Sequence, residues 1–124
     1  MIKAHVIALE NDERSSIAAD RLVESSNRVS NKFTIDRFKA VVPDDVKGIM
    51  SRANINWNYP WEGSHNCWAS GLIKTAYETA KPARRMACFL SHYSLWCESV
   101  EKGEPILVFE HDALFQQHLD VDLL

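Results

Sequence analysis

The sequence lacks an excess of basic residues, long apolar runs and an export signal. Its 14 lysines and arginines stand against 17 aspartates and glutamates, which gives a formal net charge of -3. Without a basic field we expect no nucleic acid among its partners. No apolar run approaches the roughly 20 residues that cross a bilayer, so no transmembrane segment is predicted. The N-terminus lacks the length and the cleavage site of a signal peptide, and we expect a cytoplasmic protein.

Cysteine is also scarce, and its spacing suits neither disulfides nor a metal cage. The three cysteines are an odd number, which we interpret as reduced thiols. His65 and Cys67 offer two ligands, too few for a closed zinc site. Repeats, low-complexity stretches and internal linkers are absent from the sequence as well. The 124 residues therefore predict a single domain over residues 1–124.

The first third of the chain has the pattern of a β-α-β unit. Residues 2–9 are mostly apolar and predict a strand, and residues 33–42 alternate in polarity as a second strand does. A helical stripe lies between them, and either Asn11 or Asp12 can cap it. The polar residues 25–27 suggest the point at which this helix breaks.

The remainder of the chain predicts an irregular stretch, two helices and a last strand. We expect irregular structure over residues 43–71, a short helix over 71–80 and a long helix over 83–101. The apolar run 106–109 predicts a strand buried on both faces, typical of the centre of a parallel sheet. Three of the four tryptophans fall in the irregular stretch, where they could cover the core, their commoner role, or stack on sugars or bases. They are Trp57, Trp61 and Trp68.

The last predicted strand runs directly into Glu110, His111 and Asp112. In open α/β sheets, ligands bind just beyond the carboxyl ends of the strands. A Glu-x-Asp placed there can hold a divalent cation, which can in turn hold a diphosphate. A solvated acidic turn is the competing interpretation. The side chain of His111 should point away from both carboxylates, because side chains alternate along a strand.

Three segments, in order along the chain, carry a resemblance to a known family. Residues 5–14 form a strand and a turn that ends in a Glu-Arg pair, residues 87–96 read Ala-Cys-Phe-Leu-Ser-His-Tyr-Ser-Leu-Trp, and residues 103–112 end in Glu-His-Asp. Together they resemble glycosyltransferase family 25, which includes bacterial lipooligosaccharide galactosyltransferases and collagen galactosyltransferases. The chain departs from the family pattern at Ala87, where a glycine is usual, and at His111, which replaces the middle acid of Glu-Asp-Asp.

The resemblance implies a fold, a reaction and a metal. The fold would be a three-layer, Rossmann-like GT-A type with a mainly parallel sheet. The reaction would move a hexose, most often galactose, from a UDP-sugar to a saccharide or glycoconjugate acceptor. A divalent cation would neutralise the leaving diphosphate, and oxygen ligands suit Mn²⁺ or Mg²⁺. We expect Asp112 as the first ligand of that metal and Glu110 as the second.

The resemblance also suggests which residues hold the donor. Arg14 could pair with a phosphate and Asn11 could contact the base or ribose. Arg85 and His92 lie roughly 20° apart on one helix edge and could both face the diphosphate. Arg14 is equally well explained as a surface residue, and His92 as a structural histidine. No residue is a convincing general base, and none is assigned.

Family members continue well past the acidic motif, so the chain resembles a truncated, donor-binding half of such an enzyme. This leaves an alternative function open, a non-catalytic nucleotide-sugar-binding or interaction module. Such a module could act as a homo-oligomer or with a missing C-terminal half. A different phosphate-handling enzyme with the same acidic strand end would hydrolyse its substrate without an acceptor.

Overall fold

A parallel sheet forms the centre of the molecule. The computed structural model describes residues 2–58, 62–76 and 79–123. Three parallel strands lie in the order β2-β1-β5. They are β1 (Lys3–Ala8), β2 (Ile35–Lys39) and β5 (Ile106–Glu110). The fold is therefore α/β with a parallel sheet, as the sequence predicts.

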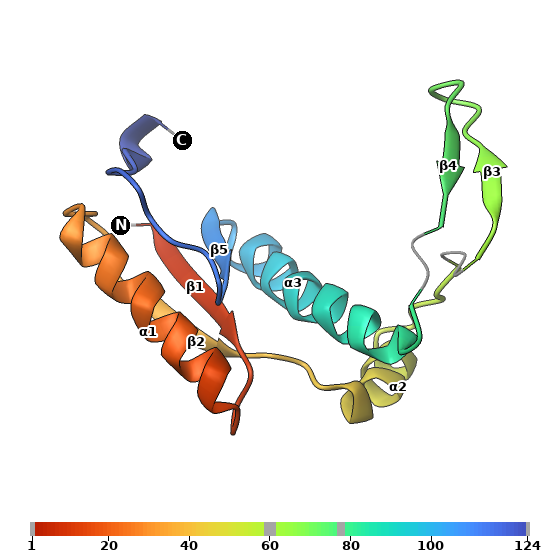
Figure 1. Cartoon of the computed structure of the whole chain (residues 1–124), viewed down its shortest axis with the longest axis horizontal. Coiled ribbons are helices and arrows are strands. Elements are labelled where there is room, and N and C mark those ends of the chain that lie inside the picture. Colours follow the sequence, from red (N-terminus) through yellow and green to blue (C-terminus); the bar gives the residue numbers. More distant parts are fainter. Residues whose placement is uncertain (1, 59–61, 77–78, 124) are drawn as a thin grey trace.

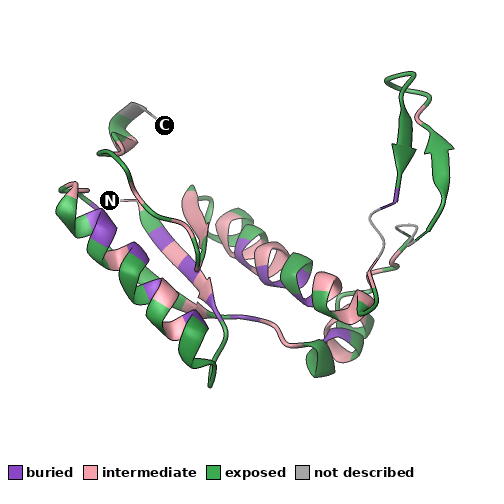
Figure 2. Ribbon diagram, viewed as in Figure 1, coloured by how far each residue is buried: buried purple, intermediate pink, exposed green. Residues whose placement is uncertain are grey.

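Helices lie on both sides of this sheet. Helix α1 (Glu13–Arg28) lies on one side and α3 (Pro82–Lys102) on the other (Figure 1). On the α1 side, alternate residues of β1 pack against the helix, so the first core cluster contains Val6, Ala8 and Leu22. The burial pattern of β1 follows the same alternation (Figure 2).

Helix α1 begins where the sequence predicts and ends later. Of the two candidate caps, Asp12 is the one used, because its carboxylate accepts the Ser15 N–H at 2.8 Å. Asn11 instead adopts a φ of 62°, the left-handed conformation that turns the chain between strand and helix. The predicted break at residues 25–27 is wrong, since the Ser25 hydroxyl donates to the carbonyl of Leu22 and is buried.

Residues 43–52 are helical, contrary to the prediction of irregular structure over residues 43–71, whereas residues 53–58 and 67–71 are irregular as predicted. Helix α2 (Pro43–Arg52) has a proline in its first turn, where the fixed φ suits a helix start, and two aspartates beside it. It packs on α3 through a second core cluster of Val46, Ala87 and Leu90. Helix α3 itself matches the prediction of a long helix over residues 83–101.

A hairpin extends from the end of α2 away from the sheet (Figure 1). It pairs β3 (Ser64–Asn66) with β4 (Ile73–Thr75), so the prediction of a helix over residues 71–80 is wrong at β4, and residues 77 and 78 lie outside the described part. Of the tryptophans, Trp57 packs edge-on against Phe89 at 5.3 Å, as a residue that covers the core would. Trp68 is 96% exposed and therefore does not cover the described core, while Trp61 lies outside the described residues.

Strand β5 differs from its predicted place. It lies at one end of the described sheet, and β1 is the central strand. Its four apolar residues are half-buried rather than buried on both faces. One face contributes Phe109, whose ring stacks against Phe33 and meets Phe115 edge-on. None of the described helices is long and apolar enough to cross a membrane.

Candidate functional site

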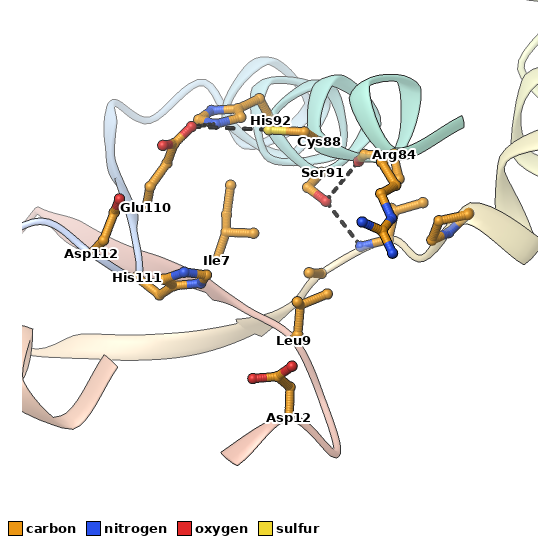
Figure 3. Close-up of a pocket in the computed structure, with 14 residues that line it drawn as sticks. Ile7, Leu9, Asp12, Arg84, Cys88, Ser91, His92, Glu110, His111 and Asp112 are labelled. Carbon is orange, nitrogen blue, oxygen red and sulfur yellow. Dashed lines mark hydrogen bonds and ion pairs between the residues drawn. The ribbon is translucent and has the colours of Figure 1, made fainter. Parts of the chain in front are cut away.

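The carboxyl ends of β1 and β5 meet α3 around a cavity of about 590 Å³ (Figure 3). Parallel strands bring their carboxyl ends to one edge of the sheet, and the register pairs Ile7 of β1 with Glu110 of β5. Part of the cavity lining is apolar, and its polar residues come from three separate segments. These polar residues are Asp12, Arg84, Cys88, Ser91, His92, Glu110, His111 and Asp112.

Ser91 fixes the position of α3 at this cavity. Its buried hydroxyl accepts the N–H of Val41 at 2.9 Å and donates to the carbonyl of Ala87 at 3.0 Å. This joins α3 to the segment that follows β2. The Ser91 hydroxyl thus both accepts from and donates to backbone groups, which gives the residue a structural role.

A second serine fixes the acidic segment. The Oγ atom of Ser15, on α1, accepts the N–H of Leu9 at 2.8 Å and lies 3.0 Å from Nδ1 of His111. Glu110 and His111 point in different directions, as strand alternation predicts (Figure 3). The histidine thereby anchors the end of β5 to the turn after β1.

Glu110 points toward α3, where it meets a thiol and an imidazole. Its Oε1 atom lies 3.3 Å from Nε2 of His92 and 4.0 Å from Sγ of Cys88. One potential ligand atom from each of these residues lies within 4.8 Å of the other two. Desolvation, and secondly the negative charge of Glu110, raise the pKa of the Cys88 thiol.

The structure brings together half of the residues that the sequence singled out. His92, Glu110 and Asp112 line the same cavity although they come from two elements. Asp112 is exposed, and the side chain of Glu110 is 60% exposed, so both carboxylates reach solvent.

The other three predicted residues lie near the cavity and are not among those that line it. Asn11 and Arg14 are exposed in the turn and first helical residues after β1, where Asp12 is the residue that faces the cavity. Arg85 is half-buried on α3, one position from Arg84, which does line the cavity.

The sequence-based prediction missed two residues of α3, Arg84 and Cys88. A signal for both was present, because Arg84, Cys88 and His92 follow one another at intervals of four residues. Side chains at that interval lie above one another on one helix face.

Comparisons with known proteins place the chain in a family. The family model described as glycosyltransferase family 25 (LPS biosynthesis protein) matches residues 1–123. The resemblance predicted from the three segments is therefore confirmed. Neither the curated proteins nor the solved structures contain a match to this chain. Membership in the matched family indicates glycosyltransferase activity, with a donor and an acceptor as substrates.

Proposed function

The chain belongs to glycosyltransferase family 25, and we propose that it takes part in moving a hexose, with galactose as the first candidate, from a UDP-sugar to a saccharide or glycoconjugate acceptor. The described sheet would be part of a GT-A type fold. One observation carries the proposal: the cavity at the carboxyl ends of two parallel strands groups a guanidinium with two carboxylates. These belong to Arg84, Glu110 and Asp112.

Arg84 is our candidate for the donor diphosphate. It is exposed, lines the cavity and carries a planar group of five N–H donors that matches phosphate oxygens. Arg14 and Asn11 remain proposed contacts of the nucleoside part, because they follow β1 on either side of Asp12, which reaches the cavity. Arg85 remains a proposed contact through its position beside Arg84.

Mn²⁺ or Mg²⁺ would be held by Asp112 and Glu110. These residues fit the metal, because both carboxylates line one cavity and both are exposed. Carboxylate oxygens are the ligands that these cations prefer. When bound, the cation would neutralise the charge that develops on the leaving diphosphate.

The protein's own residues would position these groups. His92 contacts Glu110 and orients its carboxylate, while Ser15 holds His111 and therefore the whole acidic segment. Alkyl and methyl groups of Ile7, Ala40 and Val41 form apolar walls that reduce the access of water. We assign no catalytic base.

Calorimetry of UDP binding, with and without Mn²⁺, tests the proposal. We expect binding that requires Mn²⁺, that is lost in Asp112→Ala and that persists in Asp36→Ala, which removes an exposed carboxylate of β2 outside the cavity. Arg84→Gln should weaken binding about ten- to a hundredfold, since a hydrogen bond to a charged group contributes roughly 1.5–3 kcal/mol. Equal binding by Asp112→Ala and the unaltered protein would contradict the assigned ligand.

A further inference from the structure

We propose that Cys88, His92 and Glu110 form a binding site for one transition-metal ion of the Zn²⁺ class. The site shares Glu110 with the proposed oxygen pair of Glu110 and Asp112 and takes its other two ligands from α3. The binding of this ion requires no nucleotide, so it can be tested independently of the proposed transferase reaction.

The distances between the three side chains suit such an ion. Bonds of about 2.3 Å to sulfur and about 2.1 Å to nitrogen and oxygen, at tetrahedral angles, place ligand atoms about 3.4–3.6 Å apart. The His92–Glu110 separation is 3.3 Å and the Cys88–Glu110 separation is 4.0 Å. The ligand atoms of Cys88 and His92 lie within 4.8 Å of one another. Shifts of up to about an ångström by these side chains and by the largely exposed Glu110 would bring all three separations to the tetrahedral values.

The backbone fixes two of the three ligands. Cys88 and His92 are one turn apart on α3, so their side chains lie on one face of the helix. Leu90 and Ser91, which lie between them in sequence, are buried, and Ser91 is hydrogen-bonded to Val41. The helix therefore cannot rotate about its axis without losing these contacts, and its two ligands stay directed at Glu110.

The ligand types select the class of metal. Thiolate and imidazole ligands favour Zn²⁺ and its analogue Co²⁺, whereas Mg²⁺ and Mn²⁺ favour oxygen. Three protein ligands leave one tetrahedral position open, as in catalytic rather than structural zinc sites. All three residues line the cavity, so the open position is accessible to water or to an oxygen of a bound ligand.

The two metal sites can share one residue. In Figure 3, Glu110 lies between Asp112 on one side and the Cys88–His92 pair on the other. Its Oε1 atom is the one near the thiol and the imidazole, and the carboxylate has a second oxygen. An ion on the α3 side therefore does not exclude a cation on the Asp112 side.

Titration of the reduced, metal-free protein with Co²⁺ tests the inference, because a cobalt–thiolate bond produces a charge-transfer absorption in the near ultraviolet. We expect one equivalent of Co²⁺ to produce this absorption and Zn²⁺ to abolish it. Cys88→Ser should lose it and Cys97→Ser should keep it, since Cys97 lies further along the same helix, outside the cavity. Zn²⁺ affinity should fall at least about tenfold in Cys88→Ser and in His92→Asn. Replacing a residue that only hydrogen-bonds to a metal ligand already lowers metal affinity by about that factor, and replacing the ligand itself should lower it at least as much.

The outcomes separate this site from the proposed donor site. Absence of the absorption in the unaltered protein, or its persistence in Cys88→Ser, would overturn the inference. Circular dichroism of each variant establishes that a loss of binding is not a loss of folding. Asp112→Ala should retain the cobalt absorption, because Asp112 is not a ligand of this site. If the unaltered protein binds Co²⁺ but not UDP, only the transferase proposal is refuted. A protein that binds UDP with Mn²⁺ but shows no absorption would refute only the thiolate site.

Discussion

Replacing Ser15 by alanine should destabilise the fold and loosen the acidic segment together. Ser15 is 2% exposed, and its hydroxyl contacts two residues that are far apart in sequence. It accepts the N–H of Leu9 at 2.8 Å and lies 3.0 Å from Nδ1 of His111. Alanine removes both contacts but keeps the backbone N–H that Asp12 caps, so the start of α1 should be preserved.

The expected cost follows from these two contacts. A protein hydrogen bond contributes a net of about 0.5–1.5 kcal/mol, and a partner left unsatisfied in a buried position costs more. Loss of both contacts of Ser15 should therefore lower the free energy of unfolding by about 2–3 kcal/mol. The neighbouring Ser16 provides a matched control, since among the described residues its hydroxyl accepts an exposed hydrogen bond from Arg37 and contacts no buried partner. Ser16→Ala should cost within about 0.5 kcal/mol, as surface substitutions usually do.

Urea unfolding followed by circular dichroism measures both variants. A double-mutant cycle with His111→Ala then isolates the contact between Ser15 and His111, and groups in contact usually show a coupling energy of about 0.5–3 kcal/mol. Equal destabilisation by Ser15→Ala and Ser16→Ala would refute the reasoning. So would additivity of the Ser15 and His111 substitutions, because it would mean that their side chains do not interact.

Two other perturbations have a clear expected direction. Leu90→Ala should lower the free energy of unfolding, measured in urea, by about 2–5 kcal/mol, because Leu90 of α3 is fully buried in the cluster with α2. As a control, Val100→Ala at an 81% exposed position of the same helix should change this free energy by no more than about 0.5 kcal/mol. In alkylation by iodoacetamide, Cys67 should react at lower pH than Cys88, since hydrogen bonding by Ser70 lowers the pKa of Cys67, while desolvation and Glu110 raise that of Cys88. Ser70→Ala removes the hydroxyl but keeps the backbone hydrogen bond, so it should move the pH profile of Cys67 upward, and an unchanged profile would show that the Ser70 hydroxyl does not act on the thiolate.

Local sequence patterns predicted those parts of the fold that depend on interactions between residues close in sequence. The long helix over residues 83–101 was predicted because its apolar spacing is regular. The cap of α1 was predicted only as either Asn11 or Asp12, because both side chains have the right chemistry, and the structure uses Asp12. The break at residues 25–27 was wrong because Ser25 finds a partner inside its own helix. Helix α2 was missed because its apolar pattern is short and its apolar face is buried only by packing against α3.

The place of β5 could not be predicted from its own composition. An apolar run is compatible with a central strand and with a half-buried one whose faces meet other aromatic rings. What decides between them is pairing with distant strands, and here β1 takes the central position. The carboxyl-end location of Glu110 and Asp112 was predicted correctly because it depends only on strand direction. The approach of Cys88 to Glu110 depends on how α3 crosses the sheet, which no local pattern specifies.

The candidate site is therefore assembled from two separately stabilised parts. The α1 region holds the chain after Glu110 through side-chain hydrogen bonds that span 96 and 90 residues, from Ser15 to His111 and from Ser25 to the N–H of Phe115. Cys88 and His92 instead depend on the α2–α3 cluster. A substitution in that cluster should displace the thiol and imidazole while leaving Asp112 in place. Ser15→Ala should instead displace the acidic segment while leaving Cys88 and His92 in place. If both classes of variant weakened Co²⁺ and Mn²⁺–UDP binding equally, the two parts would have to move as one, and the division of the site into a thiolate side and a carboxylate side would be wrong.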